Sequence, residues 1–227
     1  MMRACARRST PHWRAENRLQ PMLDIERAEK FIAVLDQASA FPLFDASRRL
    51  VLSHDMAVVA LEFAASVRML AHADRLPGAA VCLRSQFEAL VRAVWLLHVA
   101  SEEQLEKLDA VQLTLESQQR SKNLPMLAEM LSALEKKPQL SSLMVLLAEF
   151  RTSSWPALNS FVHAGLHAVH RTRFAYPQAL LEQAFRSSNG LCLTAYMHMG
   201  ILGGRAGIQK ELIGLSAGFA SVLPKLR

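Results

Sequence analysis

Apolar residues recur at helical spacing along nearly the whole chain, and no run alternates in the way that marks a half-buried strand. The pattern predicts helices over about residues 21–38, 45–73, 79–100 and 102–120, two shorter helices punctuated near 123–125 and 136–139, and later helices opening at Trp155-Pro156, at Tyr176-Pro177 and after Gly203-Gly204. Segment 79–100 is apolar almost all round, as a central helix would be. We therefore predict an all-α fold, a helical bundle of about eight or nine helices.

Several helix ends carry residues that favour such positions. Pro21 can be the first residue of a helix, and Asp45 or Ser47 can cap the next one. Ser101 followed by Gln104 is a capping box, and Leu76-Pro77-Gly78 is expected to break the chain.

No repeat, low-complexity tract or long linker divides the chain, so residues 21–227 are predicted to form one domain. Residues 1–20 hold five arginines and one glutamate, and we interpret them as a disordered basic arm. The length of 227 residues is enough to bury a substantial core.

The formal net charge of +6 is unevenly distributed: +4 in residues 1–20, −4 in 21–150 and +6 in 151–227. With 51% hydrophobic and 20% charged residues, the chain is not of the disordered class. Any anionic partner is therefore expected near residues 163–173, in the basic last third. Short basic pairs such as Arg48-Arg49 are interpreted as solvated faces.

Three cysteines, Cys5, Cys82 and Cys192, lie far apart, which argues against both a disulfide framework and a thiolate zinc site and favours the cytoplasm. The longest charge-free run near the C-terminus, 187–204, contains Asn189, His198 and four glycines, so we predict no membrane span there.

Two groups of polar residues could carry chemistry. Arg84, Glu88 and Arg92 follow at intervals of four and share one stripe of the apolar helix 79–100. Such a stripe is either a paired polar group inside the protein or a ladder of ion pairs facing solvent. Both interpretations stay open at this point.

The second group is a histidine stripe in NSFVHAGLHAVHR. His163, His167 and His170 share one face of a predicted helix, Asn159 precedes them by one turn, and Arg171 follows His167 by four positions. Three interpretations stay open: polar or satisfied core histidines, a metal site, and acid/base or phosphate-contacting groups. HAGLH lacks the glutamate of the HExxH zinc motif, so our leading prediction includes no metal and no cofactor.

The segments LRSQFEALVRAVWLL and LNSFVHAG together resemble a group of bacterial all-helical proteins of unknown function. Their signature is an RxxxE helix followed later by Ser or Asn and xxxH. These proteins look distantly related to the HEPN superfamily and to abortive-infection proteins of phage defence. The resemblance covers about residues 45–200 and implies a HEPN-like core that brings Arg84 and Glu88 close to Asn159 and His163.

HEPN ribonucleases cut RNA without a metal, so the resemblance implies a protein directed at RNA or nucleotides. In that function His163 would act on the ribose hydroxyl, Arg84 on the phosphate charge, Asn159 as an orienting group and Glu88 as the partner of Arg84. The contacts to substrate would come from Arg92, His167, His170 and Arg171. The family's Arg-to-His spacing is absent, since Arg151, the nearest preceding arginine, lies twelve positions before His163.

Two rival functions are also predicted. One is a non-enzymatic partner-binding or structural protein, in which the Arg/Glu/His group is a buried polar network that sets helix register. The other is a metal site on His163, His167 and His170. A homodimer is expected in either case from the apolar segment 191–203 and its small residues.

Overall fold

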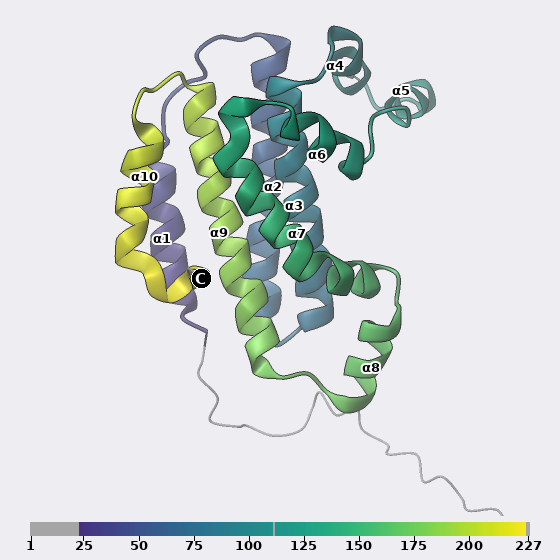
Figure 1. Ribbon diagram of the computed structural model, residues 1–227, viewed down its shortest axis with the longest axis vertical. Coiled ribbons are helices and arrows are strands. Elements are labelled where there is room, and N and C mark those ends of the chain that lie inside the picture. The colour runs from purple at the N-terminus through teal and green to yellow at the C-terminus, as the bar shows by residue number, and fades with distance from the viewer. Residues whose placement is uncertain (1–22, 111, 226–227) are drawn as a thin grey trace, which may run out of the picture.

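The computed structural model describes residues 23–110 and 112–225, and all regular secondary structure in that part of the chain is helical (Figure 1). The elements are α1 (Ile25–Ala38), α2 (Arg48–His72), α3 (Leu76–His98), α4 (Glu102–Leu108), α5 (Leu115–Ser121), α6 (Leu127–Glu135), η2 (Pro138–Leu140), α7 (Ser141–Val162), α8 (Leu166–Phe174), α9 (Gln178–Leu202), α10 (Ile208–Ser216) and η3 (Ala217–Val222). The all-α prediction is confirmed, and the ten α-helices in the described residues slightly exceed the expected number.

Helix α3 lies at the centre, as its sequence predicts. It packs against α2 and α9 on one side and against α6 and α7 on another, while α1, α10 and η3 cover α9 (Figure 1). The largest fully buried side chains of these helices include Phe31, Phe87, Phe185 and Leu90. Burial of apolar area on several faces of α3 is what holds the bundle together.

The capping box at Ser101 is confirmed. The Gln104 N–H donates to Ser101 Oγ at 3.3 Å, and the Ser101 N–H donates to Gln104 Oε1 at 2.9 Å. The single helix predicted over 102–120 is wrong, because Thr114 and Ser117 form a second capping box that starts α5. Two separate helix starts therefore replace one long helix.

Prolines also shift two predicted boundaries. Pro77 lies in the first turn of α3, where its missing N–H costs nothing, so it begins the helix and the break falls at 73–75. Pro156 lies inside α7, so the prediction that a helix opens at Trp155-Pro156 is wrong. The last turns of α7 run in a different direction from the rest of that helix in Figure 1, as a proline in a helix interior causes. Helix α9 does begin directly after Pro177.

The segment predicted to support a dimer is largely inside the chain. Most of residues 191–203 are buried in α9. A Cβ on Gly200 would lie 2.6 Å from the side chain of Ile208, and one on Gly203 would clash with the ring of Phe41. The small residues thus allow close packing within one chain, and the homodimer stays a prediction.

The basic arm 1–20, Cys5 and Pro21 lie outside the described residues. Within the described part, α2 is long and apolar enough to cross a membrane, with a mean hydropathy of 1.6 over its best window. The core helix of a soluble protein can be equally long and apolar, and α2 packs against α3 and α9. Its length and hydropathy alone are therefore weak evidence for a membrane span. Among the described residues, segment 187–204 does not meet the same criterion of length and hydropathy.

Candidate functional site

Arg84 and Glu88 form an ion pair on the side of α3 that faces α7. Arg84 Nη2 lies 2.9 Å from Glu88 Oε1, and the side chains are 20% and 38% exposed. The Arg84 guanidinium also lies over the ring of Trp155 of α7, 5.0 Å from its centroid. The pair is therefore neither sealed in the core nor fully solvated. A half-exposed pair of this kind contributes only a few tenths of a kcal/mol, so its value to the protein is mainly in positioning Arg84 over the indole.

The predicted stripe does not continue as an ion-pair ladder to Arg92. Its side chain is half-buried, its Nε is buried without a hydrogen-bond partner, and no ion pair joins it to Glu88 in the described chain. The Nε of Arg84 is buried without a partner as well. Each arginine thus keeps one guanidinium donor, its Nε–H, buried and unused.

Asn159 lies one turn beyond Trp155 on α7, and its Oδ1 is buried without a partner. Asn159 therefore lies on the same helix as Trp155, the residue whose indole ring Arg84 contacts. In the described residues no hydrogen bond or ion pair connects Asn159 or His163 to Arg84 or Glu88. The geometry places Arg84 against α7 but does not assemble the four residues into one bonded group.

The histidines predicted to share one helix are divided between two helices. His163 is the C-terminal cap of α7, where its N–H donates to the Asn159 carbonyl at 3.0 Å, and its side chain is exposed. Ala164 follows with φ +49° and the chain turns before α8 begins. The single histidine stripe is therefore wrong, because the Ala164-Gly165 turn rotates His167 and His170 onto a new helix axis.

Ser160 holds this turn together. Its carbonyl accepts from the Gly165 N–H at 2.7 Å, and its hydroxyl accepts from the His167 N–H at 2.9 Å. A hydroxyl in the last turn of α7 thus accepts from an N–H in the first turn of α8, in the way that an N-cap side chain satisfies the free N–H groups at a helix start. The NSFVHAGLH segment therefore encodes a helix-to-helix corner.

Helix α8 buries none of its nine residues. Figure 1 shows it beyond the end of the α2, α3 and α9 bundle, joined to α7 on one side and to α9 by a short segment on the other. We call the following exposed and partly exposed side chains of this helix the α8 surface: Leu166, His167, Val169, His170, Arg171, Arg173 and Phe174. No acidic residue occurs between Glu149 and Glu182, so positive charge on this surface is not neutralised by neighbours in sequence.

Aromatic and basic groups of the α8 surface lie against one another. The rings of His170 and Phe174 are 4.8 Å apart, and the Arg173 guanidinium lies 5.1 Å from the Phe174 centroid. Leu166, Val169 and Phe174 are 79%, 60% and 62% exposed. A helix that buries none of its residues and carries apolar, aromatic and basic side chains without an acid is suited to hold an anionic partner that also offers flat or apolar surface.

Buried polar contacts occur at residues that the sequence did not single out. Ser53 of α2 donates from its hydroxyl to the Ala93 carbonyl of α3 at 2.8 Å and lies 2.8 Å from His198 Nε2 of α9. Both side chains are inside the core, with Ser53 at 0% and His198 at 4% exposure. Because no substrate reaches such a pair, its role is to join three helices.

Two further polar contacts join α3 to α9 and α2 to α1. Gln86 of α3 donates to the Ser188 carbonyl at 2.9 Å and accepts from the Ser188 hydroxyl at 2.7 Å. Arg68 of α2 pairs with Glu29 of α1 at 2.8 Å. Polar networks that set helix register are thus present, at positions other than Arg84, Glu88 and His163. Their sequence signal is a lone polar residue at a core-facing position of an apolar helix.

Burial lowers the pKa of His198 to about 3, and the charges of His98 and His54 act in the same direction. Burial, followed by the charge of Lys137, also lowers the pKa of His98, whose Nε2 is buried without a partner. These histidines are therefore held neutral inside the bundle. In the described residues no group of three or more His, Cys, Asp or Glu side chains is arranged to hold a metal ion.

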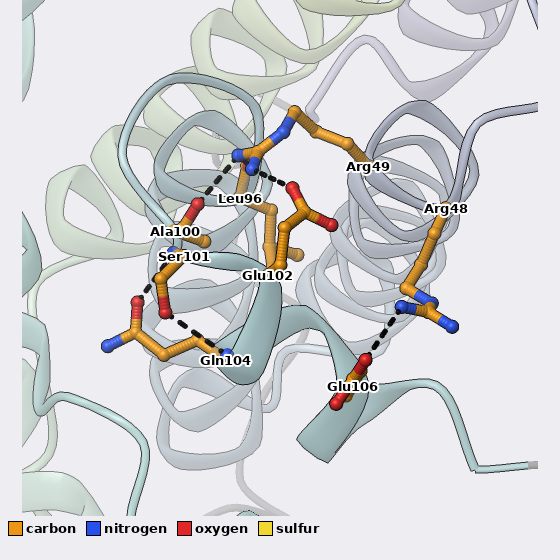
Figure 2. A network of polar contacts seen from close by, with 8 residues as sticks. All are labelled: Arg48, Arg49, Leu96, Ala100, Ser101, Glu102, Gln104 and Glu106. Atoms are coloured by element: carbon orange, nitrogen blue, oxygen red, sulfur yellow. Dashed lines mark hydrogen bonds and ion pairs between the residues drawn. The ribbon is translucent and has the colours of Figure 1, made fainter.

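Arg49 shows that one short basic pair is not a solvated face. Its Nη1 donates to the carbonyls of Leu96 and Ala100 at 2.9 and 2.8 Å, and its Nη2 pairs with Glu102 at 2.7 Å (Figure 2). The guanidinium binds one carbonyl in the last turn of α3 and one just after that helix, and its ion pair with Glu102 holds the start of α4. The interpretation of Arg49 as solvated is wrong, and the charge it carries is not available to a partner.

Comparison with known families gives one match. Residues 57–225 match the model of a family of unknown function, DUF6988. The match runs from α2 to the residues after η3, so all of the candidate site residues lie within it. No curated protein and no solved structure matches the chain.

Proposed function

The chain belongs to the DUF6988 family of unknown function, and from that premise we propose that it is a cytoplasmic RNA-binding helical protein that holds single-stranded RNA on the α8 surface. The observation that carries the proposal is that α8 buries none of its residues and combines arginine, histidine and aromatic side chains without an acid. Lys and Arg side chains neutralise phosphates, and aromatic rings stack on unpaired bases. Both kinds of group are available on this one helix.

The resemblance to HEPN-like and abortive-infection proteins supports RNA as the partner and phage defence or a toxin pair as the setting. Catalysis is a separate part of that proposal, with His163 as the acid/base group. It requires Arg84 or Arg92 to approach His163, and no contact in the described chain joins them. The geometry thus supports binding better than cleavage.

The test compares binding of a fluorescent single-stranded RNA by the full chain and by Arg171→Ala/Arg173→Ala. We expect the double variant to bind about tenfold more weakly, because it loses two guanidinium contacts to phosphates. The slope of log binding constant against log salt concentration should become less steep by about 1.4, since each contact to a single strand contributes about 0.7. Fluorescence anisotropy at several salt concentrations measures both quantities.

The matched control is Arg120→Ala/Lys122→Ala, which removes the same charge from exposed positions at α5. Equal losses in the two double variants would contradict the proposal, because net charge alone would then explain binding. Binding to vesicles with anionic phospholipids but not to RNA would assign the α8 surface to a membrane and would also contradict it. Cleavage of the bound RNA that His163→Ala abolishes would support the catalytic form.

A further inference from the structure

A hollow of about 350 Å³ lies between α6 and α7, and none of its lining residues belongs to α8. Its lining residues are Leu131, Glu135, Met144, Ala148, Arg151, Thr152, Trp155 and Pro156. The volume is at the lower end of the roughly 300–1,000 Å³ that small-molecule sites occupy. It suits one compact ligand with about the bulk of a mononucleotide.

Glu135 and Arg151 line this hollow from opposite helices, and both are exposed. In the part of the chain that the structure describes, neither side chain makes a hydrogen bond or an ion pair, with the other or with a third group. An acceptor and a cationic donor thus face one space without satisfying each other. A ligand that carries hydrogen-bond donors at one end and an anion at the other matches both.

The aromatic wall of the hollow is held in a fixed position. Trp155 packs with its ring 5.7 Å from the ring of buried Phe87 at an angle of 56°, and the Arg84 guanidinium lies over it. Phe87 in turn stacks on Phe150 at 4.6 Å. Trp155 lines the hollow and is held in place by Arg84 and Phe87, so little entropy is lost in ordering it when a ligand binds.

We propose that this hollow binds a guanine nucleotide unit, with the base against Trp155, its N1–H and N2–H donating to the Glu135 carboxylate, and its phosphate on Arg151. A carboxylate is an acceptor-only group, and guanine is the base that presents two adjacent donors on one edge. This inference rests on the proposed function, because bound RNA would supply the guanine that enters the hollow. The pocket and the α8 surface are separate sites and can fail separately.

The experiment is calorimetric titration of the full chain with guanosine 5′-monophosphate, guanosine, adenosine 5′-monophosphate and uridine 5′-monophosphate. We expect the guanine nucleotide to bind about tenfold more tightly than the other two nucleotides, because their bases lack the paired donors. Glu135→Ala should remove this preference. In Arg151→Ala the nucleotide should lose its advantage over guanosine, which has no phosphate.

The controls are Glu149→Ala and Arg120→Ala, two exposed residues that do not line the hollow; both should leave every affinity unchanged. Because Glu135 and Arg151 are exposed, thermal melts of all four variants should coincide with the parent's. Absence of binding, equal binding of the three nucleotides, or insensitivity to both Glu135→Ala and Arg151→Ala would overturn the pocket. Arg171→Ala/Arg173→Ala should bind the nucleotide normally, which separates failure of the pocket from failure of RNA binding at α8.

Discussion

Replacing Phe87 with alanine is expected to lower the free energy of unfolding by about 3–5 kcal/mol, the range for loss of a fully buried phenyl ring. Phe87 of α3 is 0% exposed, and its ring stacks on Phe150 and packs against Trp155, both of α7. Its removal leaves a cavity that Phe150 and Trp155 cannot fill without leaving their present positions. Urea unfolding followed by circular dichroism at far-ultraviolet wavelengths measures the loss.

Phe44→Ala is the matched control, because Phe44 is 75% exposed and the same atoms are removed. We expect it to cost less than about 1 kcal/mol, as substitutions at exposed positions usually do. Similar losses for the two variants would contradict the packing of α7 on α3 described above. The same result would remove the support for the orientation of Trp155 at the hollow.

Acidification is expected to destabilise the protein through His198. In the folded chain its pKa is about 3, while the ordinary pKa of histidine is 6.5, so between these values the unfolded state binds the proton and the folded state does not. Stability therefore falls as the pH decreases through 6.5 towards 3. This one residue should account for a loss of about 2 kcal/mol between about pH 7.5 and pH 5.

His198→Gln keeps a polar side chain beside Ser53 and removes the titration. Its unfolding free energy should be lower at neutral pH, and its loss on acidification should be smaller than the parent's by about 2 kcal/mol. His72→Gln, at an exposed position of α2, should behave as the parent does. An unchanged acid dependence in His198→Gln would show that His198 is not held neutral in the core.

Much of the fold could be predicted from the sequence, because helical periodicity and end signals are local. The central position of α3, the Ser101 capping box and the start of α9 after Pro177 follow from such signals. Pro156 could not be placed correctly, because a proline is tolerated at a helix start and also at a bend, and packing of α7 on α3 decides between them. The division of residues 102–120 depends on a second cap that periodicity does not reveal.

The candidate site was predictable in composition but not in arrangement. The Arg84–Glu88 pair follows from spacing of four, whereas the stacking on Trp155 depends on how two distant helices pack. Helical spacing predicts a single histidine stripe, and the left-handed Ala164 divides it. Ser53 and His198 could not be paired from the sequence, because a serine and a histidine 145 positions apart carry no joint signal in one sequence.

The central claim, that single-stranded RNA lies on the α8 surface, is tested most directly by photocrosslinking. The full chain is irradiated with an oligoribonucleotide that carries photoreactive uridines, and the crosslinked peptides are identified by mass spectrometry. Crosslinks are expected at the aromatic and imidazole rings of residues 161–174, with a large loss in Arg171→Ala/Arg173→Ala. Crosslinks confined to residues 1–22, or distributed over the bundle and unaffected by the double variant, would contradict the account.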